Sequence, residues 1–170
     1  NMRRFRSVIQ QINLKNDDTL YVLGDVIVRF PDGLRILREL MAMPNAKMLL
    51  GNHEYMMLRA LGHPYDPYDP TSKLIKEEAT AHWYRNGGRV THSHWKHIRK
   101  SLRQEIIQYL LNLPLNIDVE INGQKYKLVH GAPMDEYMNY PGNPSQIHFA
   151  VWKRWNQNDT FTGDFTMIFG

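Results

Sequence analysis

The sequence has 170 residues, of which 42% are hydrophobic and 22% charged, a composition typical of one globular domain with its own core. Its 21 basic and 17 acidic residues give a formal charge of +4, which suits an anionic substrate without indicating nucleic acid. The lack of cysteine excludes disulfides and thiolate metal sites, and no apolar run reaches membrane-spanning length. We therefore expect a soluble, cytoplasmic protein without a nucleic-acid or membrane partner.

The first third of the chain alternates helical and strand patterns. Apolar residues at helical spacing predict a helix over residues 2–13, and an apolar strand follows at 19–25. The helical period returns at 31–43, before a second strand at 46–52 and a third helix at 53–61. This order of elements implies parallel strands in an α/β sheet.

The rest of the chain is less regular. Residues 62–100 combine a proline-rich loop with polar and aromatic residues of no clear period, and we predict an insert or lid there. A helix is predicted from residue 101 to the proline at 114. Residues 116–131 alternate apolar and polar side chains around Asn122-Gly123, which predicts an antiparallel hairpin. A helix at 145–155 and a strand at 166–170 complete the prediction.

Three of the predicted strands end on glycine and on polar side chains. Asp25 follows the first strand, Asn52 and His53 follow the second, and His130 follows a strand of the hairpin. Ligands of open α/β sheets bind beyond the carboxyl ends of strands, and these oxygen and nitrogen donors suit Mn²⁺, Fe or Zn. Taken singly, each of these residues favours a structural role, Asn52 as a helix cap and His130 as a buried core histidine.

The segments "GDVIVR", "LLGNHE" and "LVHGA" resemble the second, third and fourth motifs of the calcineurin-like metallophosphoesterases. The resemblance runs over the whole chain and is strongest to the phosphoprotein phosphatase branch, with its bacterial and phage serine/threonine phosphatases. It implies an α/β fold of two packed β-sheets flanked by helices. It also implies one domain over residues 1–170 that is incomplete at both termini.

The resemblance assigns metal ligands by position. It implies that Asp25 bridges two divalent metal ions and that Asn52 and His130 bind the second of them. Mn²⁺ is the favoured metal, with Fe or Zn as alternatives. The family's first motif, Gly-Asp-x-His-Gly, and its last, Gly-His, have no counterpart in this sequence. We therefore expect one aspartate and two histidines of the family's ligand set to be missing.

The resemblance also assigns residues to the substrate. It implies that His53 is the general acid for the leaving oxygen and that Arg29 binds the phosphoryl oxygens, with Arg154 as a second phosphate-binding arginine. The family pattern Gly-Asp-x-x-Asp-Arg has an aspartate that orients the histidine acid, and this chain has Val28 there. Valine accepts no hydrogen bond, so His53 is expected to lack its orienting partner.

The activity that these motifs imply is metal-dependent hydrolysis of phosphomonoesters by a metal-activated water. We expect a serine/threonine protein phosphatase that acts on a phosphorylated protein or a small phosphoester. One alternative is a dinucleoside tetraphosphate hydrolase of the same family, and another is a non-catalytic pseudophosphatase that binds phosphate or protein. The motifs do not separate these readings, because the discriminating contacts lie in loops such as 62–100 and 133–143.

Overall fold

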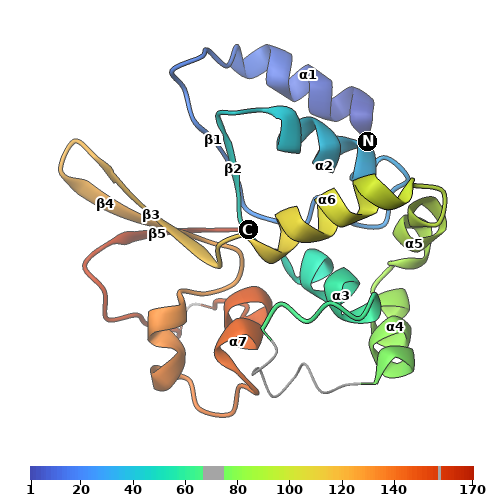
Figure 1. Ribbon diagram of the computed structural model, residues 1–170. Coiled ribbons are helices and arrows are strands. Elements are labelled where there is room, and N and C mark those ends of the chain that lie inside the picture. Colours follow the sequence, from blue (N-terminus) through green and yellow to red (C-terminus); the bar gives the residue numbers. More distant parts are fainter. Residues whose placement is uncertain (67–74, 157) are drawn as a thin grey trace.

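The computed structural model describes residues 1–66, 75–156 and 158–170, which form an α/β fold of helices and two small sheets (Figure 1). The helices of this part of the chain are α1 (Met2–Ile12), α2 (Gly33–Ala42), α3 (Asn52–Ala60), α4 (Lys76–Arg85), α5 (Arg89–Trp95), α6 (Lys100–Leu111), the 3₁₀-helix η2 (Met134–Asn139) and α7 (Gln146–Trp152). None of the described helices is long and apolar enough to cross a lipid bilayer.

The first sheet pairs β1 (Leu20–Val22) with β2 (Ala46–Met48), and the two strands are parallel as predicted. Both strands are shorter than the apolar runs that predicted them. After β1 the backbone leaves the extended conformation, because Gly24 has a φ of 91° and Asp25 a φ of 58°. The strand therefore stops just before the residues expected to bind a ligand.

The second sheet has the order β3 (Asn116–Ile121), β4 (Gln124–Val129) and β5 (Thr166–Phe169). The first two strands form the predicted antiparallel hairpin, and β5 adds to β4 in parallel. Asn122 and Gly123 both have positive φ values, 53° and 78°, as a two-residue type I′ turn requires. In Figure 1 the hairpin extends away from the helices, while the carboxyl end of β4 returns toward them.

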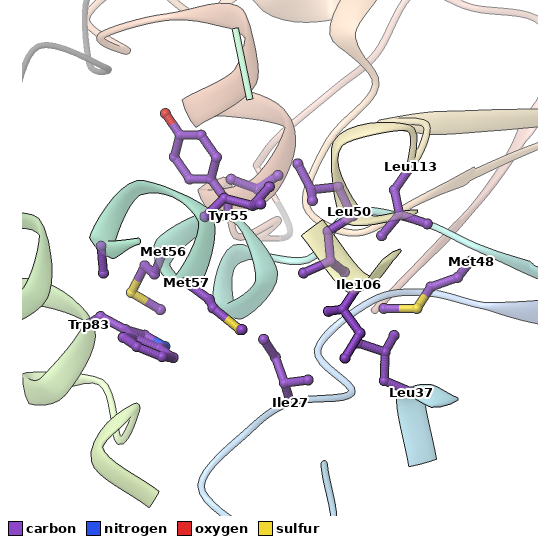
Figure 2. Packing of buried hydrophobic residues seen from close by; sticks show 14 of the residues in the cluster. Ile27, Leu37, Met48, Leu50, Tyr55, Met56, Met57, Trp83, Ile106 and Leu113 are labelled. Atoms are coloured by element: carbon purple, nitrogen blue, oxygen red, sulfur yellow. The ribbon is translucent and has the colours of Figure 1, made fainter. Parts of the chain in front are cut away.

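The hydrophobic core surrounds α3, whose residues are almost all buried. Met56 and Met57 of this helix point toward Trp83 and Ile27 in Figure 2, and Ile106 of α6 belongs to the same cluster. A short helix that is buried on nearly every side is held in place by the packing around it. As a result, the first turn of α3, which begins with Asn52, is held rigidly inside the domain.

Helices α4 and α5 lie in the stretch where the sequence showed no helical period. Their anchors are Trp83, which is fully buried, and Trp95, which is 4% exposed, and both belong to the core cluster. Two large aromatic side chains among polar residues bury enough surface to fix a helix without producing an apolar stripe. The assignment of 62–100 as an insert or lid stays a prediction, and residues 67–74 of it lie outside the described residues.

Candidate functional site

Four of the residues predicted for the site lie together, although they come from three separate loops. The backbone N–H of His53 donates to Asp25 Oδ1 at 3.0 Å. The Nε2 atom of His130 lies 3.6 Å from Asp25 Oδ1 and 3.0 Å from the facing side-chain atom of Asn52. The carboxyl ends of β1, β2 and β4 therefore bring one carboxylate, one amide and two imidazoles to a single place.

Two glycines allow this close approach. A Cβ atom on Gly24 would lie 2.7 Å from Gly51 Cα and 2.9 Å from His130 Nδ1. One on Gly51 would lie 2.4 Å from Asp25 Oδ1. Any side chain at either position would therefore push the loops apart, which explains why the strand ends carry glycine directly before the polar residues.

Glu54 holds the segment that follows β1, residues 23–30, which we call the Asp25 loop. Its side chain is fully buried, and its Oε2 atom accepts the Asp25 N–H at 2.9 Å. Its Oε1 atom accepts the N–H groups of Val26 and Ile27 at 2.8 and 3.1 Å. Burial, reinforced by the charge of Asp25, raises the pKa of Glu54 to about 7. Sequence reasoning gave this residue no role, although an acidic side chain at the start of an apolar helix was a signal for one.

His130 is oriented for binding a cation. Its Nδ1 atom lies 2.6 Å from the carbonyl oxygen of Leu23, so Nδ1 carries the proton and donates it, which leaves a lone pair on Nε2. The Asn52 side-chain atom beside it lies 3.0 Å from His130 Nε2 and 3.1 and 3.0 Å from the Asp25 carboxylate oxygens. With the amide nitrogen at that position, its two hydrogens face three acceptor atoms. With the amide oxygen there, four atoms with lone pairs converge.

The donor set of Asp25, Asn52 and His130 fits a divalent metal ion, because a cation satisfies converging lone pairs from a carboxylate, an amide oxygen and an imidazole. No cluster of three or more His, Cys, Asp and Glu side chains suited to a metal occurs in the described residues. A metal ion at this place would need the amide of Asn52 as its third ligand. The fit is to one cation held by three side chains.

His53 lies beside this donor set in a different environment. Burial lowers the pKa of its imidazole, the charges of Arg29 and Arg154 act in the same direction, and Asp25 opposes them. Its Nδ1 atom is buried and has no hydrogen-bond partner within the described part of the chain. The valine at position 28 offers no acceptor. This environment disfavours the imidazolium that a general acid requires.

The two arginines come from separate segments and are both exposed. Arg29 ends the turn of the Asp25 loop with a φ of 52°. Arg154 follows α7, which stops at Trp152 instead of continuing to 155 as predicted, because Lys153 adopts an extended conformation with a ψ of 134°. Both guanidinium charges act on the pKa of His53, so both arginines lie on the side of the site where that imidazole is found.

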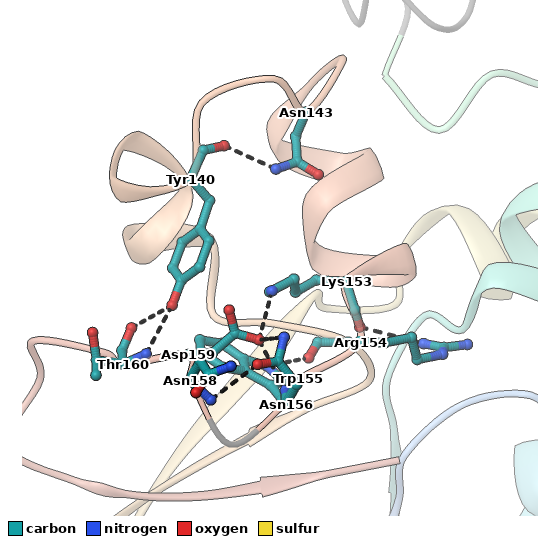
Figure 3. A network of polar contacts seen from close by, with 10 residues as sticks. Tyr140, Asn143, Lys153, Arg154, Trp155, Asn156, Asn158, Asp159 and Thr160 are labelled. Carbon is teal, nitrogen blue, oxygen red and sulfur yellow. Dashed lines mark hydrogen bonds and ion pairs between the residues drawn. The ribbon is translucent and has the colours of Figure 1, made fainter.

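Figure 3 shows what holds Arg154, in the segment of residues 153–156 and 158–160 that we call the Arg154 loop. The ammonium of Lys153 lies 2.7 Å from Asp159 Oδ2 and over the ring of Tyr140. The indole N–H of Trp155 donates to the carbonyl of Gly131 at 2.7 Å. Since Gly131 directly follows His130, this bond ties the loop to the backbone beside that histidine.

Curated relatives share parts of this sequence. The chain is 40% identical over 58 residues to a symmetrical bis(5′-nucleosyl)-tetraphosphatase of Proteus mirabilis, covering 33% of this chain and 21% of the relative. It is 35% identical over 78 residues to one of Legionella pneumophila, covering 42% and 28%. It is 38% identical over 77 residues to one of Vibrio vulnificus, covering 42% and 29%. The matched part is thus less than a third of each relative, and these names correspond to the alternative reading of the sequence rather than to a protein phosphatase.

Two solved structures are similar at low identity. A metallophosphoesterase from Sphaerobacter thermophilus matches with a TM-score of 0.43 and 17% identity, over 88% of this chain and 44% of that one. A hypothetical protein from Pyrococcus horikoshii OT3 matches with a TM-score of 0.42 and 19% identity, over 78% and 48%. The sequence profile described as calcineurin-like phosphoesterase matches residues 1–166. The chain therefore belongs to the calcineurin-like phosphoesterase family, whose members use divalent metal ions.

Proposed function

We propose that the protein is a metal-dependent hydrolase of dinucleoside polyphosphates. The observation that carries the hydrolase is the convergence of Asp25, Asn52 and His130 beside His53, with two exposed arginines on the same side. The substrate class is supported by the relatives, which are named as symmetrical bis(5′-nucleosyl)-tetraphosphatases. This choice replaces the phosphoprotein substrate, which no relative reported above supports.

The residues of this chain divide the work by their chemistry. Asp25, Asn52 and His130 would hold the cation, which when bound supplies Lewis acidity and lowers the pKa of a coordinated water. Arg29 and Arg154 offer planar forks of donors that match the oxygens of a phosphate group. Because both arginines are exposed, they are available to a polyphosphate that approaches from solvent.

A polyphosphate also suits the environment of His53. Symmetrical hydrolysis adds water across the central P–O–P linkage: the water oxygen bonds to one phosphorus, and the other half leaves as a nucleoside diphosphate. That leaving group is far less basic than the alkoxide of serine or threonine and needs little protonation. A histidine with a lowered pKa and a valine at position 28 is therefore a smaller handicap for this reaction than for a protein phosphatase.

The test compares substrates at fixed Mn²⁺. We expect the protein to release ADP from diadenosine tetraphosphate faster than phosphate from a phosphoserine peptide, as measured by ion-exchange chromatography. Arg29→Ala should lower kcat/KM for the tetraphosphate about 10- to 100-fold through the loss of charge-assisted hydrogen bonds, whereas the exposed Arg4→Ala should have no effect. Turnover of the phosphopeptide alone would contradict the proposed substrate.

A non-catalytic phosphate-binding protein is the second candidate. It is favoured by one observation, the buried Nδ1 atom of His53 that has no partner in the described residues. It predicts that inorganic phosphate binds with the same dependence on Arg29 while none of these substrates turns over. The binding and turnover measurements together therefore distinguish the two functions.

A further inference from the structure

Helices α4 and α5 contact the Asp25 loop at two places beyond the site itself. We propose that this helix pair positions Arg29, with Gly87 and Thr91 as the positioning residues. The inference rests on the proposed function in one respect, namely that Arg29 binds phosphate. The contacts of Gly87 and Thr91 described below are to Arg29 and Ile27, so both residues would act through the Asp25 loop.

The first contact is made by Gly87, two residues after α4 ends. Its φ is +91°, and a Cβ atom added to it would lie 2.6 Å from Arg29 Cγ and 3.4 Å from Arg29 Cδ. The stem of the arginine therefore lies directly over the bare glycine backbone. Arg29 itself has a left-handed backbone, with a φ of 52°.

The second contact is made by Thr91, a residue of α5 that is only 2% exposed. Its hydroxyl donates to the carbonyl of Ile27 at 2.8 Å, across 64 residues of sequence. The N–H of Ile27 is already bound by Glu54 at 3.1 Å. The loop is thus fixed from α3 on one side and from α5 on the other, two residues before Arg29.

A simpler explanation is that glycine occurs at position 87 only because helix α4 ends there. A second glycine in the chain provides a control for this explanation. Gly62 occupies the equivalent position, two residues after α3 ends, with a φ of +82°. Among the residues that the structure describes, no atom beyond the glycine and its two chain neighbours lies within 4 Å of where its Cβ would be. Alanine at either position meets the same backbone strain, but only alanine at 87 meets the arginine stem, so the difference between the variants isolates the contact.

The experiment measures Arg29 and phosphate separately in Gly87→Ala and Gly62→Ala. The Nε–H resonance of Arg29 in an NMR spectrum, assigned by its loss in Arg29→Lys, should shift and broaden only in Gly87→Ala. The affinity for inorganic phosphate at fixed Mn²⁺ should fall about tenfold in Gly87→Ala and remain unchanged in Gly62→Ala. An Arg29 resonance in Gly87→Ala that matches wild type would overturn the inference.

Thr91 provides an independent pair of variants. They test the positioning of Arg29 even if Gly87→Ala does not fold. Thr91→Val removes the donor to Ile27 and should move the Arg29 resonance, whereas Thr91→Ser keeps the hydroxyl and should restore it. Identical resonances in the valine and serine variants would contradict the role of this residue. If the wild-type protein binds no phosphate, the proposed function fails, while the resonances still test the positioning.

Discussion

The Asp25 loop and the Arg154 loop each place an arginine near His53. The two loops are held in position by different kinds of interaction. The first is fixed by a fully buried carboxylate that accepts three backbone N–H groups. The second is fixed by a lysine–aspartate pair, whose side chains are 16% and 12% exposed, and by one indole hydrogen bond. A fully buried carboxylate that binds three N–H groups is costlier to disturb than one ion pair with partial access to solvent, so the position of Arg29 should depend more strongly on the core than that of Arg154.

The largest effect is expected for Glu54→Gln. Glutamine retains one carbonyl oxygen, so its NH₂ group faces backbone N–H groups of the Asp25 loop and leaves at least one of them unpaired. We expect the free energy of unfolding to fall by about 2–3 kcal/mol in urea titrations. The control is Glu105→Gln on the exposed face of α6. A loss no greater than in the control would remove the contrast between the two loops.

The next effect is expected for Val28→Asp, within the Asp25 loop. A carboxylate that reaches the buried Nδ1 of His53 would raise the pKa of that histidine and orient its ring. We expect kcat for an alkyl phosphate to rise about tenfold, with a smaller gain for diadenosine tetraphosphate, whose leaving group needs less protonation. Val28→Asn, which accepts a hydrogen bond without charge, separates orientation from protonation. Equal gains for both substrates would show that protonation is not what the aspartate restores.

A smaller effect is expected in the Arg154 loop from Trp155→Phe. The ring contact with Tyr140 is kept, but the hydrogen bond to Gly131 is lost, at a cost of about 1 kcal/mol of stability. Since Arg154 is the adjacent residue, KM for a phosphoester should rise while kcat stays constant. Tyr140→Phe, which loses a hydroxyl bonded to Thr160 further from the arginine, serves as the control. The same rise in KM in both variants would mean that the loop responds as a whole.

The smallest effect is a pH dependence of the Arg154 loop. The hydrogen bond from Lys153 holds the pKa of Asp159 below its ordinary value of 3.8, so the pair contributes stability above that value and loses it as pH falls through the lower folded-state pKa. The melting temperature of Asp159→Asn should therefore differ from wild type by a small, constant amount above about pH 5, and the difference should vanish in stronger acid. A difference that persists there would point to a packing effect.

Local pattern was enough to predict much of the fold and the composition of the site. The parallel strands, the hairpin at Asn122-Gly123 and the α/β class are confirmed, because each depends on residues close in sequence. The grouping of Asp25 with Asn52 could be predicted because β1 and β2 share a sheet and end at the same edge. His130 follows β4 of the second sheet, and its place beside them was expected from the resemblance to the family's motifs. Their roles as ligands stay predictions.

What the sequence did not show depends on distant partners. Glu54 accepts hydrogen bonds from backbone N–H groups 27 to 29 residues away in the sequence. No pattern of residue spacing predicts partners at that separation. Helices α4 and α5 are fixed by Trp83 and Trp95 rather than by a periodic stripe. The end of α7 is set by a lysine that turns away to meet Asp159, an interaction visible only once the loop is folded.

The hydrogen bond between His130 and Leu23 has a consequence for how the molecule forms. It joins residues 107 apart, and contacts of such separation form slowly because a long loop must first be closed. During synthesis the Asp25 loop emerges well before His130, so the early chain would lack one of the three side chains proposed to hold the cation. Ligand binding should therefore be among the last properties gained in folding and among the first lost when the β4 end of the chain detaches.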